Sequence, residues 1–264
     1  MKIKRSTLII SLMLALFLMQ PLAAAASTAS EAKQDWLDAK QQSLEVQEIH
    51  REAKVAWAAD QTPENDQAVV DTGKDALNAA LDEVESWLLW KSLEAEENPQ
   101  IPEDLKQSIS DDVDNNLQKI DELRGDVDAV ETRLELGLTS LKMVGKYLEL
   151  LTDVARNSGN VWVHVADEKA DTVEHFESIL REAAEDMDDN EAIIEKLDMA
   201  KVELQSARDN IDRAEAEYEQ VVVPGTPLIK FSNGNNYLRI AKGNLISSHG
   251  HLNQAYNMIR AGGK

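Results

Sequence analysis

Residues able to bind a metal ion occur at helical spacing in one stretch of the sequence. Four of them stand at positions i, i+4, i+7 and i+11: His164, Glu168, Asp171 and His175. This spacing places all four on one side of a helix, and imidazole and carboxylate groups are ligands of zinc and copper. The apolar residues of the same stretch recur on nearly the opposite side. The candidate ligands are therefore expected to face solvent, and an exposed polar face is the favoured interpretation.

A fifth candidate, His50, lies on an apolar helical seam. The residues of this seam are spaced three and four apart: Ala32, Trp36, Ala39, Ser43, Val46, His50, Ala53 and Trp57. A polar residue in a seam fixes the register of two helices at some loss of stability, and this is the expected role of His50. The alternative is a pH switch, because imidazole titrates near neutral pH.

Catalytic motifs are missing from the sequence. It has no cysteine, no Gly-rich phosphate loop, no GxSxG and no HExxH. Two stretches that begin at Asp112 and Asp186 start like calcium loops, but both lack the glycine and the glutamate that such loops need. Trp87 and Trp90 are expected in the core, with a ligand groove as the alternative. We expect no enzymatic activity, no catalytic residue and no cofactor.

The first residues have the features of an export signal. Three basic residues within the first five positions precede the uncharged run 7–19, and a run of alanines ends at Ala26. The apolar stretch 7–19 is too short to span a membrane, which needs roughly 20 residues. We therefore expect cleavage of residues 1–26 and release of residues 27–264, with an extracellular, cell-surface or periplasmic location.

The charge balance narrows the choice of partners. The 49 Asp and Glu residues outnumber the 27 Lys and Arg residues, giving a net charge of −22. Such a surface repels nucleic acid and anionic membranes. The expected partners are therefore other exported proteins, basic ones among them, or a second copy of the chain.

Helical periodicity covers nearly the whole mature sequence, and no strand-like alternation competes with it. Proline and glycine divide it into six segments: 30–60, 63–97, 102–157, 160–188, 190–222 and 228–262. The third segment carries a heptad seam: Val113, Ile120, Val127, Leu134, Leu141 and Leu148. These patterns predict an all-α, elongated antiparallel helical bundle of coiled-coil type with about six helices.

Large and small residues alternate along the last two segments. In the first of them the alternating residues are Leu197, Ala200, Leu204, Ala207, Ile211, Ala214, Tyr218 and Val221. Small residues let two helices approach closely, so residues 190–264 are expected to form a tightly packed antiparallel hairpin. The stretch 220–264 holds five basic residues and no acidic one. It is expected to dock against the acidic bundle, with docking onto another molecule as the alternative.

The sequence as a whole predicts a non-enzymatic exported helical bundle with a structural or protein-interaction role. The alternative is an exported binding protein that holds a metal ion or a small apolar ligand between its helices.

Overall fold

A computed structural model of the chain describes residues 28–185, 187 and 189–262. Six helices account for most of these residues: α2 (Thr28–Ala59), α3 (Pro63–Glu96), α4 (Glu103–Asp128), α5 (Arg133–Glu185), α6 (Glu191–Glu219) and α7 (Pro227–Gly262). The described ranges contain no strand, and the predicted all-α bundle of about six helices is confirmed. The expected signal peptide lies outside the described residues.

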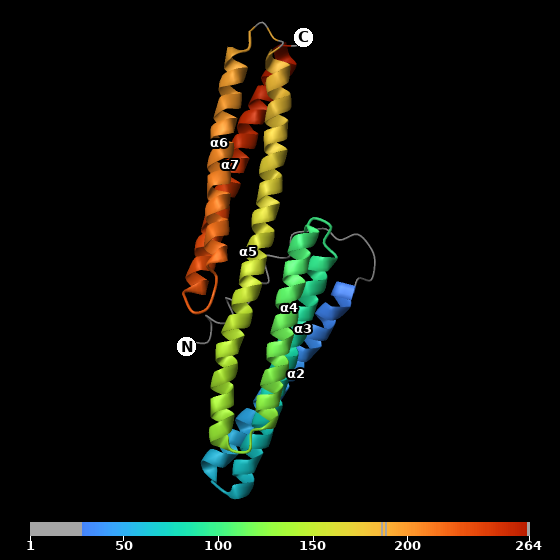
Figure 1. Cartoon of the computed structure of the whole chain (residues 1–264), viewed down its shortest axis with the longest axis vertical. Coiled ribbons are helices and arrows are strands. Elements are labelled where there is room, and N and C mark those ends of the chain that lie inside the picture. Colours follow the sequence, from blue (N-terminus) through green and yellow to red (C-terminus); the bar gives the residue numbers. More distant parts are fainter. Residues whose placement is uncertain (1–27, 186, 188, 263–264) are drawn as a thin grey trace.

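Helix α5 belongs to two bundles. It has 53 residues, which at about 1.5 Å per residue makes it roughly 80 Å long. Its N-terminal half lies beside α3 and α4, with α2 on the other side of α3, and its C-terminal half packs against α6 and α7 (Figure 1). Because both bundles share this one helix, the molecule is elongated.

The boundary between the third and fourth helices differs from the prediction. Helix α4 ends at Asp128 and α5 runs from Arg133 to Glu185, whereas the sequence predicted helices at 102–157 and 160–188. A break therefore lies inside the predicted third helix. The predicted junction at Ser158-Gly159-Asn160 is continuous helix.

A capping box explains where α5 begins. The Thr132 hydroxyl accepts a hydrogen bond from the Glu135 amide at 3.3 Å. In return, the Glu135 carboxylate accepts hydrogen bonds from the Thr132 amide at 3.0 Å and the Glu131 amide at 2.9 Å. These reciprocal bonds satisfy amides that have no partner within the helix and so favour a helix start at this point.

Helix α5 continues through Gly159, and the missing side chain of this glycine makes room for an aromatic ring. A Cβ atom on Gly159 would lie 2.4 Å from the ring of Tyr218, and one on Gly234 would lie 2.5 Å from it. Tyr218 of α6 is therefore held between a glycine of α5 and a glycine of α7, and it is fully buried. Its hydroxyl donates a hydrogen bond to Asn235 Oδ1 at 2.7 Å.

The break before α5 changes which of its residues are buried. Of the predicted seam, Leu134, Leu141 and Leu148 are 75 %, 71 % and 47 % exposed. Leu136 and Leu150 are buried instead. The seam prediction is wrong here because the turn between α4 and α5 reverses the chain, so that the heptad phase of α4 does not carry over into α5.

Helices α6 and α7 form an antiparallel pair with close backbone approach. All eight alternating residues of the α6 stretch are buried, and so are the small residues that recur every seven positions on α7: Gly234, Ala241, Ser248 and Ala255. The basic helix α7 thus docks within its own chain, against α5 and α6. Within the described ranges the pair Lys230–Glu217, at 3.3 Å, is the one ion pair that joins α7 to the rest of the bundle. The apolar seam, rather than charge, holds α7 in place.

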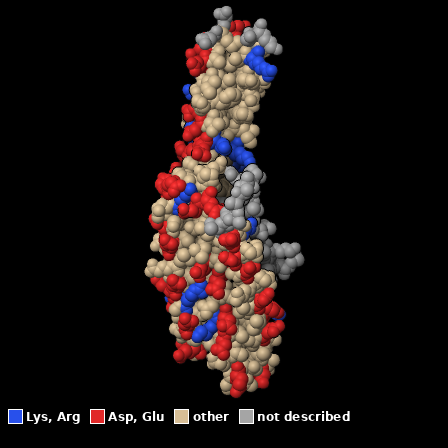
Figure 2. Space-filling view, turned by 90° about the vertical axis from the view of Figure 1, so that its right-hand side faces the viewer, with Lys and Arg blue, Asp and Glu red and all other residues tan. Residues whose placement is uncertain are grey.

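On the face shown in Figure 2, acidic side chains are spread over the lower part of the molecule, and the upper part is mostly uncharged. Lys and Arg are fewer than Asp and Glu in the chain. Among the described helices, none is both long and apolar enough to cross a membrane.

Candidate functional site

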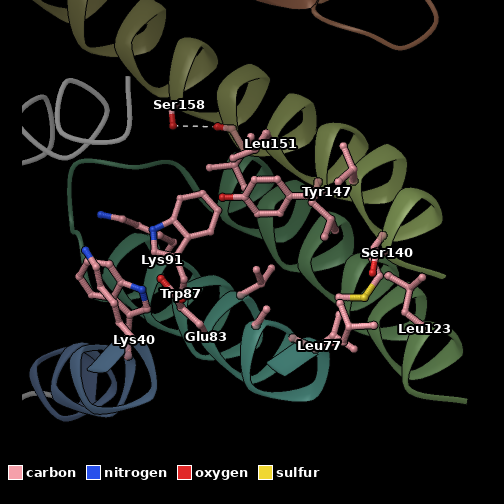
Figure 3. A pocket seen from close by; sticks show the side chains of 18 residues that line it. Lys40, Leu77, Glu83, Trp87, Lys91, Leu123, Ser140, Tyr147, Leu151 and Ser158 are labelled. Carbon is pink, nitrogen blue, oxygen red and sulfur yellow. Dashed lines mark hydrogen bonds between the residues drawn. The ribbon is translucent and has the colours of Figure 1, made fainter. Parts of the chain in front are cut away.

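An apolar groove of about 500 Å³ lies between α2, α3 and α5, and we call it the α3–α5 groove (Figure 3). Helix α3 forms one wall with residues spaced three and four apart, which share one side of the helix. These residues are Leu77, Ala80, Leu81, Val84, Trp87 and Lys91. Helix α5 forms the facing wall with Ser140, Met143, Val144, Tyr147, Leu150, Leu151, Val154 and Ser158. The remaining lining residues are Trp36 and Lys40 of α2, Glu83 of α3 and Leu123 of α4.

Small side chains leave this space open. Ala80, Ser140 and Ser158 line the groove where larger residues would fill it. The two serine hydroxyls are turned to their own helix and donate to the Leu136 and Val154 carbonyl oxygens at 2.7 Å and 2.8 Å. Protein interiors rarely contain voids larger than a water molecule, so an apolar space of this size is suited to a ligand.

The two ends of the groove differ in polarity. Lys40, Trp87 and Lys91 lie at one end, and Leu77 and Leu123 lie at the other (Figure 3). From Leu77 to Lys91 the wall formed by α3 is roughly 20 Å long, at about 1.5 Å per residue. The volume of about 500 Å³ is spread over this length, so the groove is long and narrow, with cationic side chains at one end only.

Lys91 is held by an acid and by aromatic rings. Its ammonium group lies 2.6 Å from the Glu94 carboxylate and 3.8 Å from the centroid of the Trp90 ring. Trp90 in turn stacks on Trp36 of α2, with ring centroids 4.9 Å apart. Burial lowers the pKa of Lys91, and Glu94 opposes this effect. The ammonium group is thus a partly desolvated cation that is fixed in position.

Lys40 differs from Lys91 because, among the described residues, no acidic side chain lies within ion-pairing distance of it. The ammonium group of this half-buried residue lies 5.0 Å from the centroid of the Trp36 ring. On the facing wall, burial and then the charge of Glu83 raise the pKa of Tyr147, so its hydroxyl keeps its proton. This end of the groove therefore offers a cation and a hydrogen-bond donor.

Comparisons with protein-family models, with curated proteins and with solved structures find no match to this chain. The function is therefore inferred from the geometry and the chemistry of the groove.

The four candidate metal ligands do not converge. They lie on the C-terminal half of α5, beyond the residues of that helix that line the groove, and no group of three or more metal-binding side chains occurs among the described residues. His164 Nε2 is 3.7 Å from a Glu168 carboxylate oxygen. Asp171 accepts a hydrogen bond from Arg208 of α6 at 2.8 Å, and His175 is exposed. The Asp171 carboxylate is thus engaged by a neighbouring helix.

His50 lies between α2 and α3. Its Nδ1 atom is 3.1 Å from the hydroxyl of Thr72, which itself donates to the Ala68 carbonyl oxygen at 2.7 Å. Because the hydroxyl proton is used in that bond, Nδ1 must carry the proton and donate to Thr72. Burial, followed by the charge of Lys54, lowers the pKa of His50 and favours the neutral ring. A pH switch at this position stays a prediction.

The sequence contained one signal for the groove. Trp87 was expected in the core, with a groove as the alternative, and it lines the α3–α5 groove. Trp90, its neighbour in the same motif, is buried against Trp36. The lining residues of α5 could not be recognised from the sequence. Which of them face the groove depends on the heptad phase of α5, and this phase is set anew at the break between α4 and α5.

Proposed function

We propose that the protein is an exported, non-enzymatic binding protein that holds a small apolar ligand in the α3–α5 groove. The observation that carries the proposal is the groove itself. Its volume of about 500 Å³ falls within the range of small-molecule sites, and aliphatic and aromatic side chains form most of its walls. A ligand that covers these side chains would gain free energy from the burial of apolar surface.

Quenching of tryptophan fluorescence by bromododecane tests this proposal, because bromine quenches an indole ring that it touches. We expect saturable quenching in the wild-type protein, since Trp87 lines the groove. The variant Trp87→Phe should lose much of this quenching. The matched variant Trp57→Phe should keep it, because Trp57 lies outside the groove beside Arg133. Quenching that is not saturable, or that both variants reduce equally, would contradict the proposal.

A second candidate is the protein-interaction role, and a separate feature favours it. The N-terminal half of α5 exposes a charge-free face, which we call the α5 apolar face: Leu134, Leu138, Leu141 and Leu148. Gly137 and Gly145 lie within this face, and a Cβ atom on either would meet no neighbouring atom within 4 Å. Contiguous exposed apolar surface of this kind is typical of an interaction site.

A second copy of the chain is the partner that this face fits best. The spacing of Leu134, Leu138, Leu141 and Leu148 is that of a heptad seam, which is complementary to an identical seam. Both lysines beside the face are paired within the chain, Lys142 with Asp126 and Lys146 with Glu149. These pairs reduce the like-charge repulsion between two acidic copies that approach along α5.

A single introduced cysteine tests this pairing, because the natural chain has none. Leu141 lies at the centre of the face, so in an antiparallel two-fold dimer it would meet its own copy. We expect Leu141→Cys to form a disulfide-linked dimer under mild oxidation. Val202→Cys, at an exposed position on α6, should stay monomeric. Equal cross-linking of both variants, or of neither, would exclude the dimer.

A further inference from the structure

We infer that the ligand of the α3–α5 groove is a single-chain amphiphile whose anionic head group lies beside Lys40. This inference rests on the proposed function, because it specifies the chemistry of the ligand that the groove binds. The shared chemistry is a carboxylate, sulfate or phosphate group on one long alkyl chain.

The charges that line the groove favour an anionic head group. Acidic residues outnumber basic ones by 49 to 27 in the chain, yet the groove is lined by two lysines and one glutamate. Lys91 is paired with Glu94. Glu83 faces Tyr147, whose pKa is raised by burial and then by the charge of Glu83. Lys40 is the lining cation that has no acid within ion-pairing distance in the part of the chain that the structure describes. A ligand anion would provide that partner.

Two other lining side chains also favour an acceptor-rich head group. The Trp87 indole can only donate a hydrogen bond, and the Tyr147 hydroxyl keeps its proton. Trp87 lies at the lysine end of the groove, and Tyr147 lies midway along it with its hydroxyl turned towards that end (Figure 3). Carboxylate, sulfate and phosphate oxygens accept hydrogen bonds, and a charged acceptor strengthens them.

The shape of the groove favours a ligand with a single alkyl chain. The groove is roughly 20 Å long from Lys91 to Leu77, and beyond the lysine end its walls are formed by Leu77, Leu81, Val84 and the apolar residues of α5. Such a narrow apolar channel suits one extended alkyl chain.

The whole protein is strongly acidic and would repel an anion from most of its surface. A preference for anionic ligands must therefore come from the groove itself.

Isothermal titration calorimetry with three ligands of equal chain length tests the inference: dodecanoate, dodecanol and dodecyltrimethylammonium. Dodecanoate should bind about tenfold more tightly than dodecanol, the gain from about one charge-assisted contact, and the cationic ligand should bind most weakly. Lys40→Gln should remove this tenfold advantage and leave dodecanol binding unchanged. Lys54→Gln removes the same charge from an exposed position on the same helix and should change neither affinity.

The outcomes separate the two proposals. If dodecanol binds as tightly as dodecanoate, or if both lysine variants weaken dodecanoate equally, the anionic head group is excluded and the apolar groove remains. If none of the three ligands binds, the proposed function fails as well.

Discussion

Gly234→Ala is expected to lower the free energy of unfolding by about 3 kcal/mol. The same substitution at Gly243, farther along α7, is expected to raise it by up to about 1 kcal/mol. The two substitutions have opposite effects because the surroundings of the two glycines differ. A Cβ atom on Gly234 would lie 2.5 Å from the Tyr218 ring, whereas one on Gly243 would meet nothing within 4 Å.

The Tyr218 ring cannot easily move away from the added methyl group. Gly159 of α5 lies against the ring, and Phe231 packs against it with a centroid distance of 5.8 Å. The Tyr218 hydroxyl is also bonded to Asn235. Adding an atom to such a closely packed site forces side chains from their preferred rotamers or moves the helices apart. At the exposed Gly243 the substitution changes only helix propensity, which favours alanine.

Chemical denaturation of the wild-type protein and of the two variants, monitored by circular dichroism, measures both effects. The double variant Gly234→Ala/Tyr218→Leu provides the control for the mechanism. If the ring causes the strain, the alanine should cost much less in the absence of the ring, so the two substitutions should not be additive. Equal effects at Gly234 and Gly243, or strict additivity with Tyr218→Leu, would contradict the described packing of the three helices.

This packing shows what the sequence could and could not predict. The alternation of large and small residues in α6 is a local pattern, and its period correctly indicated the buried side. Gly159, Tyr218 and Gly234 come from three helices, and no local pattern connects them. In the sequence, Gly159 therefore resembles a helix end. In the structure, its lack of a side chain leaves room for the ring of Tyr218, which is distant along the chain.

The break between α4 and α5 was predictable in principle. The sequence has the capping-box pattern of a threonine followed three residues later by a glutamate, at Thr132 and Glu135. The heptad spacing continues through this pattern from Val127 to Leu134 and so concealed it. Because the chain turns here, the buried side of α5 follows a new phase.

The groove could not be predicted from the sequence for a similar reason. Its walls belong to helices whose relative rotation is set by that same turn, and a cavity is the space that the packed side chains leave. Aliphatic residues such as Leu81 and Leu151 have the same spacing whether they touch each other or line a void. Only Trp87, at the polar end, gave a signal in the sequence.

Filling the groove is expected to have the largest effect on function. Ala80 lies in the α3 wall, where a tryptophan side chain would occupy the space of an alkyl chain. We expect Ala80→Trp to weaken dodecanoate binding by at least about 100-fold, because the ligand can no longer bury its chain. The melting temperature should change little, since the new side chain fills an existing space.

The most direct test of this account is therefore the calorimetric affinity of dodecanoate for wild-type, Ala80→Trp and Ala216→Trp proteins. Ala216 is exposed on α6, so a tryptophan there adds the same bulk away from the groove. The account predicts binding by the wild type and by Ala216→Trp, and loss of binding by a folded Ala80→Trp protein. If Ala80→Trp binds dodecanoate as tightly as the wild type, the ligand does not occupy the α3–α5 groove.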